Sequence, residues 1–86
     1  MEHSTPPTAP EMTILPPFVS NSIEAVGHDG RNLWIRYRRK NAPGTGALYC
    51  FENVPRVHMQ DLMKHPRPGK YFTDVIRFRF PGLRLS

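Results

Sequence analysis

A tryptophan and several arginines in one short stretch are the side chains best suited to contact another molecule. The stretch "LWIRYRR" (residues 33–39) places Trp34, Arg36 and Arg38 on one side if it is extended. An aromatic ring among arginines can stack a nucleobase while the guanidinium groups hold phosphates. The pattern therefore predicts a face that binds RNA or another nucleic acid, and we expect further phosphate contacts from other cations: Arg39, Lys40, Lys70 and Arg79.

The alternative for this face is packing. Trp34 would then be covered by a helix or by "ILPPF" (residues 14–18), and the arginine stems would lie over apolar surface. The sequence leaves both possibilities open.

The charge of the chain is divided unevenly. Residues 31–86 hold all twelve Lys and Arg residues against three acids, a net charge of +9, whereas residues 1–30 hold four acids and no Lys or Arg. A part this basic attracts polyanions, which include RNA, DNA and acidic protein surfaces.

A second stretch, "KYFTDVIRFRF" (residues 70–80), ends in strict alternation. If it is extended, Ile76, Phe78 and Phe80 share one face and Arg77 and Arg79 the other. We expect Arg77 to form an internal salt bridge with Asp74 or Asp61, and Arg79 to lie on the surface.

Few residues are arranged for catalysis or metal binding. Cys50 lies in a predicted strand, where a packed thiol is expected. His58, Asp61 and His65 share one helix face and could approach a metal, but an exposed polar face is the favoured explanation. No phosphate-binding glycine loop and no pair of carboxylates is present. We expect no enzyme, no cofactor and no metal site.

The sequence also indicates a compartment. One cysteine allows no disulfide within the chain, which suits a reducing environment. No apolar run approaches the ~20 residues of a membrane span, and the first residues do not form a signal peptide. We expect a cytoplasmic protein.

Alternation and turn residues predict the elements. Strands are expected at residues 22–28, 33–39 and 47–53, and a helix follows over residues 56–65, with Asn53 near its cap and Pro55 at its first position. Its buried stripe is Met59, Leu62 and Met63. The prediction is an α+β fold: a small three-stranded antiparallel sheet (β-β-β), a helix, and a short C-terminal helical or extended element that includes a turn over residues 70–75.

Read together, "SNSIEAVGHD", "LWIRYR", "ALYCFENVP" and "GKYFTDVIRFRF" resemble the KTSC domain, a family named for its place at the C-terminus of some bacterial lysyl-tRNA synthetases. The positions that match its pattern include Ser22, Tyr49, Phe51, Pro55, Gly69, Tyr71, Phe72, Ile76 and Arg77. The chain departs from the family at Arg67, where a small Ser is usual, and at Thr73, where Asn is usual.

Five prolines within the first seventeen residues predict a flexible, proline-rich tail (residues 1–17), and the rest of the chain (residues 18–86) forms the KTSC-like domain, with the resemblance covering about residues 20–80. The resemblance implies an RNA-related function only by association with a tRNA synthetase. The expected function is a small non-enzymatic module that binds nucleic acid. The alternative is a protein-interaction module, which could be encoded by a phage and act on a host complex. It would meet an acidic partner through its basic face or through the proline-rich tail, which has a P-x-x-P spacing at Pro7 to Pro10.

Overall fold

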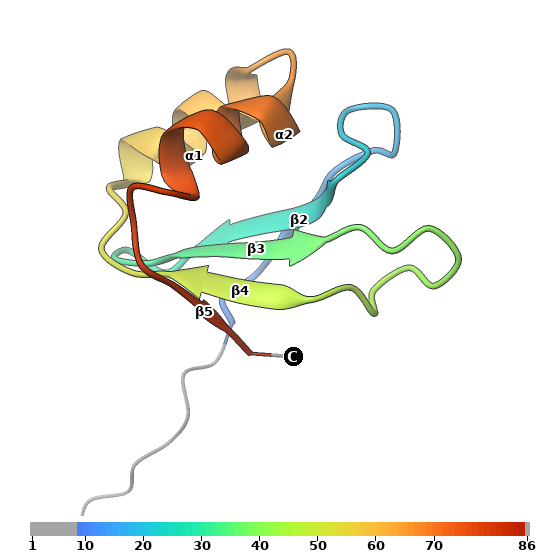
Figure 1. Ribbon diagram of the computed structural model, residues 1–86, viewed down its shortest axis with the longest axis horizontal. Helices are drawn as coiled ribbons and strands as arrows, with labels where there is room; N and C mark the ends of the chain where they lie inside the picture. The colour runs from blue at the N-terminus through green and yellow to red at the C-terminus, as the bar shows by residue number, and fades with distance from the viewer. Residues whose placement is uncertain (1–8, 86) are drawn as a thin grey trace, which may run out of the picture.

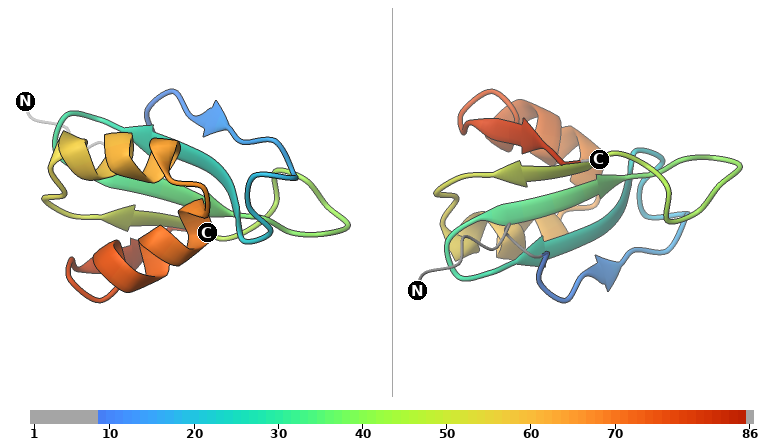
Figure 2. Two further views of the ribbon diagram at one scale, coloured as in Figure 1. Left: turned by 90° about the horizontal axis from the view of Figure 1, so that it is seen from above. Right: turned by 90° about the horizontal axis from the view of Figure 1, so that it is seen from below.

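The fold is a single antiparallel sheet with helices on one face (Figures 1 and 2). The structure, a computed structural model, describes residues 9–85. Its five strands lie in sequential order: β1 (Thr13–Ile14), β2 (Ile23–His28), β3 (Leu33–Tyr37), β4 (Leu48–Phe51) and β5 (Gly82–Arg84). The helical part consists of α1 (Arg56–Lys64), α2 (Pro68–Tyr71) and the π-helical turn η1 (Phe72–Ile76).

The predicted α+β class is confirmed, but the predicted count of three strands is wrong. A short strand is added at each edge of the sheet: β1 pairs with β2, and β5 pairs with β4. Proline has no backbone N–H group, but residues 11–15, between Pro10 and Pro16, contain no proline. Thr13 and Ile14 therefore keep the N–H donors that strand pairing needs. The predicted tail is thus part of the sheet at these two residues, and residues 1–8 lie outside the described part.

The predicted faces of β3 and of the helix α1 are confirmed. Leu33 and Ile35 are fully buried in the core beneath the helices, and Leu62 of α1 meets them there. Met59 and Met63 pack against the same core. The helix begins differently from the prediction: Pro55 occupies the cap position and Asn53 makes no cap.

The stretch from Lys70 to Phe80 does not form a strand. It is helical as far as Ile76, because Phe72 and Ile76 lie four residues apart and both enter the core. The Phe72 ring meets the Phe51 ring edge-on, with 5.1 Å between the ring centroids. The alternation therefore does not produce one apolar face: Ile76 is buried, whereas Phe78 is 81% exposed in the turn that follows.

Within residues 9–85, no helix is long and apolar enough to cross a membrane.

Candidate nucleic-acid interface

Trp34 is buried, so the prediction that it stacks a base is wrong. Its side chain is 1% exposed, and alternation along β3 puts it on the opposite side of the sheet from Leu33 and Ile35, which belong to the core beneath the helices. Gly27 lies opposite Trp34 across β2 and β3. A Cβ atom on Gly27 would lie only 2.6 Å from the Met12 sulfur and 3.1 Å from a Pro10 side-chain carbon. The chain just before β1 thus crosses the Trp34 side of the sheet at Gly27. Of the two possibilities for Trp34, the structure shows a packed side chain.

Arg36 and Arg38 are occupied by the fold of their own chain. Arg36 donates to the carbonyl oxygens of Gly44 and Gly46, at 3.1 and 2.8 Å, and so holds the loop between β3 and β4. Arg38 donates to four carbonyl oxygens at 2.9 to 3.4 Å, those of Leu15, Pro16, Ser20 and Ile23. The predicted row of Trp34, Arg36 and Arg38 therefore holds the fold together.

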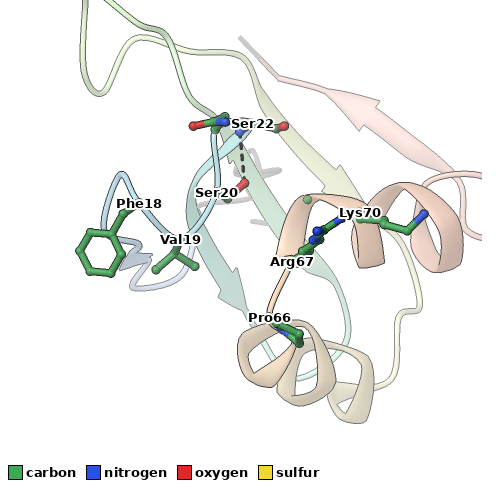
Figure 3. A pocket seen from close by; sticks show the side chains of 9 residues that line it. Phe18, Val19, Ser20, Ser22, Pro66, Arg67 and Lys70 are labelled. Carbon is green, nitrogen blue, oxygen red and sulfur yellow. Dashed lines mark hydrogen bonds between the residues drawn. The ribbon is translucent and has the colours of Figure 1, made fainter.

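A groove lies between the loop that precedes β2 and the connection from α1 to α2 (Figure 3). It has a volume of about 420 Å³, and its walls are residues 18–22 on one side and Pro66, Arg67, Gly69 and Lys70 on the other. Ser20 shapes the first wall, because its buried hydroxyl accepts hydrogen bonds from the N–H groups of Ser22 and Ile23, at 3.1 and 3.0 Å.

Gly69 allows the two walls to meet. A Cβ atom there would lie 3.2 Å from the Ser20 hydroxyl oxygen and 3.3 Å from that of Ser22. Any other residue would push α2 away from the serines or displace their hydroxyl groups.

The charges on the groove are all positive. Arg67 and Lys70 line it, and a second hollow of about 420 Å³, lined by Asn21, Arg38 and Lys40, adjoins it through Asn21. No acidic residue lines either hollow. We call the two hollows together the basic groove. A third hollow differs, because Arg31 and Glu52 give its wall both signs of charge.

The structure brings together only some of the predicted cations. Arg38, Lys40 and Lys70 line the basic groove, and Arg39 is exposed next to Lys40 in the chain. Arg79 is exposed as predicted, in the turn after η1, and does not line the groove.

Several residues of the groove were not among the predicted contacts, and Arg67 and Phe18 are the most prominent of them. Arg67 drew attention only as a departure from the family pattern, and Phe18 only as the end of "ILPPF". The replacement of a small Ser by a large cation could have marked Arg67 as a candidate contact residue. No local pattern placed Phe18 opposite it.

Arg77 does not form the predicted salt bridge. Asp74 instead pairs with Lys70, four residues earlier in the same helical segment, at 3.0 Å. The Arg77 guanidinium lies over the Phe78 ring, 5.4 Å from its centroid.

The three possible metal ligands surround a tyrosine. The Tyr71 hydroxyl group donates a hydrogen bond of 3.5 Å to the Asp61 carboxylate, and the His58 Nδ1 atom lies 3.3 Å from the same hydroxyl oxygen. The His65 ring packs against the Tyr71 ring. Burial raises the pKa of Tyr71, and the nearby Asp61 carboxylate raises this pKa further. Within the described residues, no group of three His, Cys, Asp or Glu side chains could hold a metal ion.

Cys50 is buried and free. Burial raises the pKa of its thiol, and the charges of Asp29 and Glu52 act in the same direction. The side chain is thus held in its weakly nucleophilic thiol form.

The sequence matches the KTSC domain over residues 19–80. The chain belongs to the KTSC domain family. Its structure is similar to the crystal structure of the KTSC domain protein YPO2434 from Yersinia pestis, with a TM-score of 0.72 and 24% identity over 88% of this chain and 97% of that one. At this identity the similarity concerns the fold. A search of curated proteins found no significant match.

The KTSC motif residues divide between core and groove. Phe51, Phe72 and Ile76 build the core, Tyr49 packs against it, and Pro55 precedes α1. Ser22, from the first of the four motifs, and Gly69, from the last, meet in the basic groove.

Proposed function

We propose that this KTSC domain is a non-enzymatic module that binds nucleic acid, RNA foremost, through the basic groove. The observation that carries the proposal is electrostatic: every charged side chain that lines the two adjoining hollows is positive. A concave surface lined by one sign of charge concentrates its field and attracts the opposite charge.

The groove supplies both of the contacts that a nucleic-acid backbone needs. Arg67 and Lys40 are exposed and, among residues 9–85, pair with no carboxylate, so their charges are available to phosphates. Asn21 and Ser22 line the same groove and can hydrogen-bond to phosphate or sugar oxygens. Arg38 adds charge but is held by backbone carbonyl groups.

The absence of an enzymatic role is part of the proposal. The groove contains no histidine, cysteine or carboxylate on its lining, and the one thiol of the chain is buried elsewhere. Its serine hydroxyls have no histidine or carboxylate beside them on that lining to act as a general base.

The test is the salt dependence of binding. Fluorescence anisotropy would measure the affinity for a short labelled single-stranded RNA, a tRNA and a duplex DNA at several salt concentrations. Replacing Arg67 and Lys40 by Gln should weaken binding and flatten the slope of log K against log salt by about 0.7 per lost contact on a single strand.

Arg56→Gln is the control for this test. Arg56 is an exposed cation at the start of α1, outside the groove, so the substitution removes the same charge from another place. Binding without salt dependence, or equal losses in the control and in the groove variants, would contradict the proposal.

A second candidate function is a protein-interaction module with an acidic partner. It is favoured by Phe78, an exposed aromatic ring next to Arg77 and Arg79, because aromatic and arginine side chains are enriched in protein interfaces. Because Thr13 to Leu15 belong to the domain, a test of the proline-rich segment should remove residues 1–8 alone. A partner lost on this deletion, with RNA binding retained, would identify that segment as a separate binding site.

A further inference from the structure

Phe18 is the most exposed of the large apolar side chains that the structure describes, at 89%. Within residues 9–85 its ring makes no contact with another aromatic ring or with a cation. The other aromatic rings are occupied: Tyr37, Tyr49, Phe51 and Phe72 contact one another, and Phe80 contacts His58. Phe78 has one face under Arg77. Phe18 is therefore the one phenylalanine of the described chain whose ring faces are unoccupied.

The fold holds Phe18 in this exposed place. The turn that carries it is closed by a hydrogen bond of 3.0 Å from the Val19 N–H to the Pro16 carbonyl oxygen. Pro16 and Pro17 restrict the backbone before the ring. Arg38 holds the carbonyl groups on both sides of this turn, those of Leu15 and Ser20. Because the loop is anchored at both ends, the exposure of the ring is a property of the folded domain.

Phe18 stands at the rim of the basic groove, on the wall opposite Arg67 and Lys70 (Figure 3). An exposed apolar ring at the rim of a groove that two cations line suits a ligand that has both a flat apolar part and negative charge. A nucleotide has both, since its base can stack on an aromatic ring while its phosphate meets the cations.

Resting on the nucleic-acid function proposed above, we propose that Phe18 stacks an unpaired base of single-stranded RNA, while Arg67 and Lys70 hold the adjacent phosphates. Stacking on a side chain requires a free base face, which the interior of a duplex does not offer. The groove therefore selects single strands, loops and ends over duplex, and it does so with little dependence on base identity, because every base has such a face.

The test compares Phe18→Ala with Phe78→Ala, a second exposed phenylalanine that lies outside the groove. Binding of a short single-stranded RNA, a DNA of the same sequence and the RNA duplex would be measured for both variants. Loss of one stacked base costs about 1–3 kcal/mol, so Phe18→Ala should weaken single-strand binding at least about fivefold and leave duplex binding unchanged. Phe18→Tyr keeps the ring and should retain binding, and Phe78→Ala should behave as the parent protein.

The emission of Trp34, the only tryptophan of the chain, reports whether each variant keeps its fold, since its ring is buried beneath other residues. If Phe18→Ala binds single strands as the parent does while Arg67→Gln weakens binding, the stacking inference is wrong and the proposed function stands. If the parent protein binds none of the three ligands, the proposed function itself fails. If Phe18→Ala loses as much affinity for the duplex as for the single strand, the inference is also overturned. If the protein binds the single-stranded DNA as tightly as the RNA, and Phe18→Ala weakens both, the inference holds for single strands of either sugar.

Discussion

The indole N–H of Trp34 donates a hydrogen bond of 3.1 Å to the carboxylate of Asp29. The other oxygen of this carboxylate accepts the N–H groups of Arg31 and Asn32, at 2.9 and 2.7 Å. One side chain thus closes the turn between β2 and β3 and satisfies the polar atom of the buried ring. The Trp34 ring, which the sequence suggested could stack a base, is instead held by a hydrogen bond to the adjacent β2–β3 turn.

Asp29→Ala should therefore destabilise the domain. The Trp34 N–H would lose its partner beside a buried ring, which costs about 1–3 kcal/mol. Chemical denaturation followed by Trp34 emission would measure the free energy of unfolding. Asp29→Asn keeps an oxygen acceptor and should lose less, and equal losses in the two variants would show that the acceptor is unimportant.

The charge on Asp29 should make stability depend on pH. Partial burial alone would raise the pKa of Asp29, but hydrogen bonds from Asn32, Arg31 and Trp34 hold it below the ordinary 3.8. A pKa that is lower in the folded state stabilises the fold at neutral pH, and this contribution disappears as the pH falls below 3.8 and through the folded pKa. The stability difference between the parent and Asp29→Asn should shrink over that range, and a constant difference would contradict the assignment.

Arg38→Met should loosen the segment before β2. The substitution leaves the carbonyl groups of Leu15, Ser20 and Ile23 without their charged donor, which should cost about 2 kcal/mol. Hydrogen exchange should show the loss as faster exchange at Leu15 and Ile23. Arg39→Met alters the neighbouring exposed cation and should change stability by less than about 0.5 kcal/mol. Similar losses in both variants would show that the contacts of Arg38 add little.

Leu15→Ala should show that the predicted tail contributes to the core. Leu15 is 5% exposed and belongs to the core cluster, so the substitution should cost about 2–4 kcal/mol in thermal or chemical unfolding. Ile14, its neighbour in the chain, is 66% exposed, and Ile14→Ala should stay within about 0.5 kcal/mol of the parent. Equal, small effects would mean that this segment does not support the domain.

Asp74→Asn should strengthen nucleic-acid binding if the basic groove is the binding surface. The substitution releases Lys70 from its ion pair and removes a negative charge beside the groove. Because the pair is exposed, its loss should change the free energy of unfolding by less than about 0.5 kcal/mol. Anisotropy should show tighter RNA binding, with a salt slope steeper by up to about 0.7. Unchanged or weaker binding would indicate that Lys70 does not contact phosphate.

Local patterns were sufficient for the central elements. Alternation placed Leu33 and Ile35 on the core side of β3, and the spacing of Met59, Leu62 and Met63 marked the buried side of α1. These features follow from the geometry of one strand or one helix, which a short window of sequence contains. The order of the four motifs was also enough to identify the KTSC family, and the composition by itself established the strong positive charge of residues 31–86.

The tertiary structure decided which surfaces remained free. Alternation put Trp34 and Arg38 on one face, but residues 10–12 fold back over Gly27 beside Trp34, and Arg38 holds carbonyl groups of Leu15, Ser20 and Ile23, which lie 15 to 23 residues earlier in the chain. Likewise, Phe18 and Arg67 line opposite walls of one groove although 48 residues separate them. A periodic pattern tells which side chains share a face of one element. What covers that face depends on distant segments, whose positions are set only when the whole sheet packs against its helices.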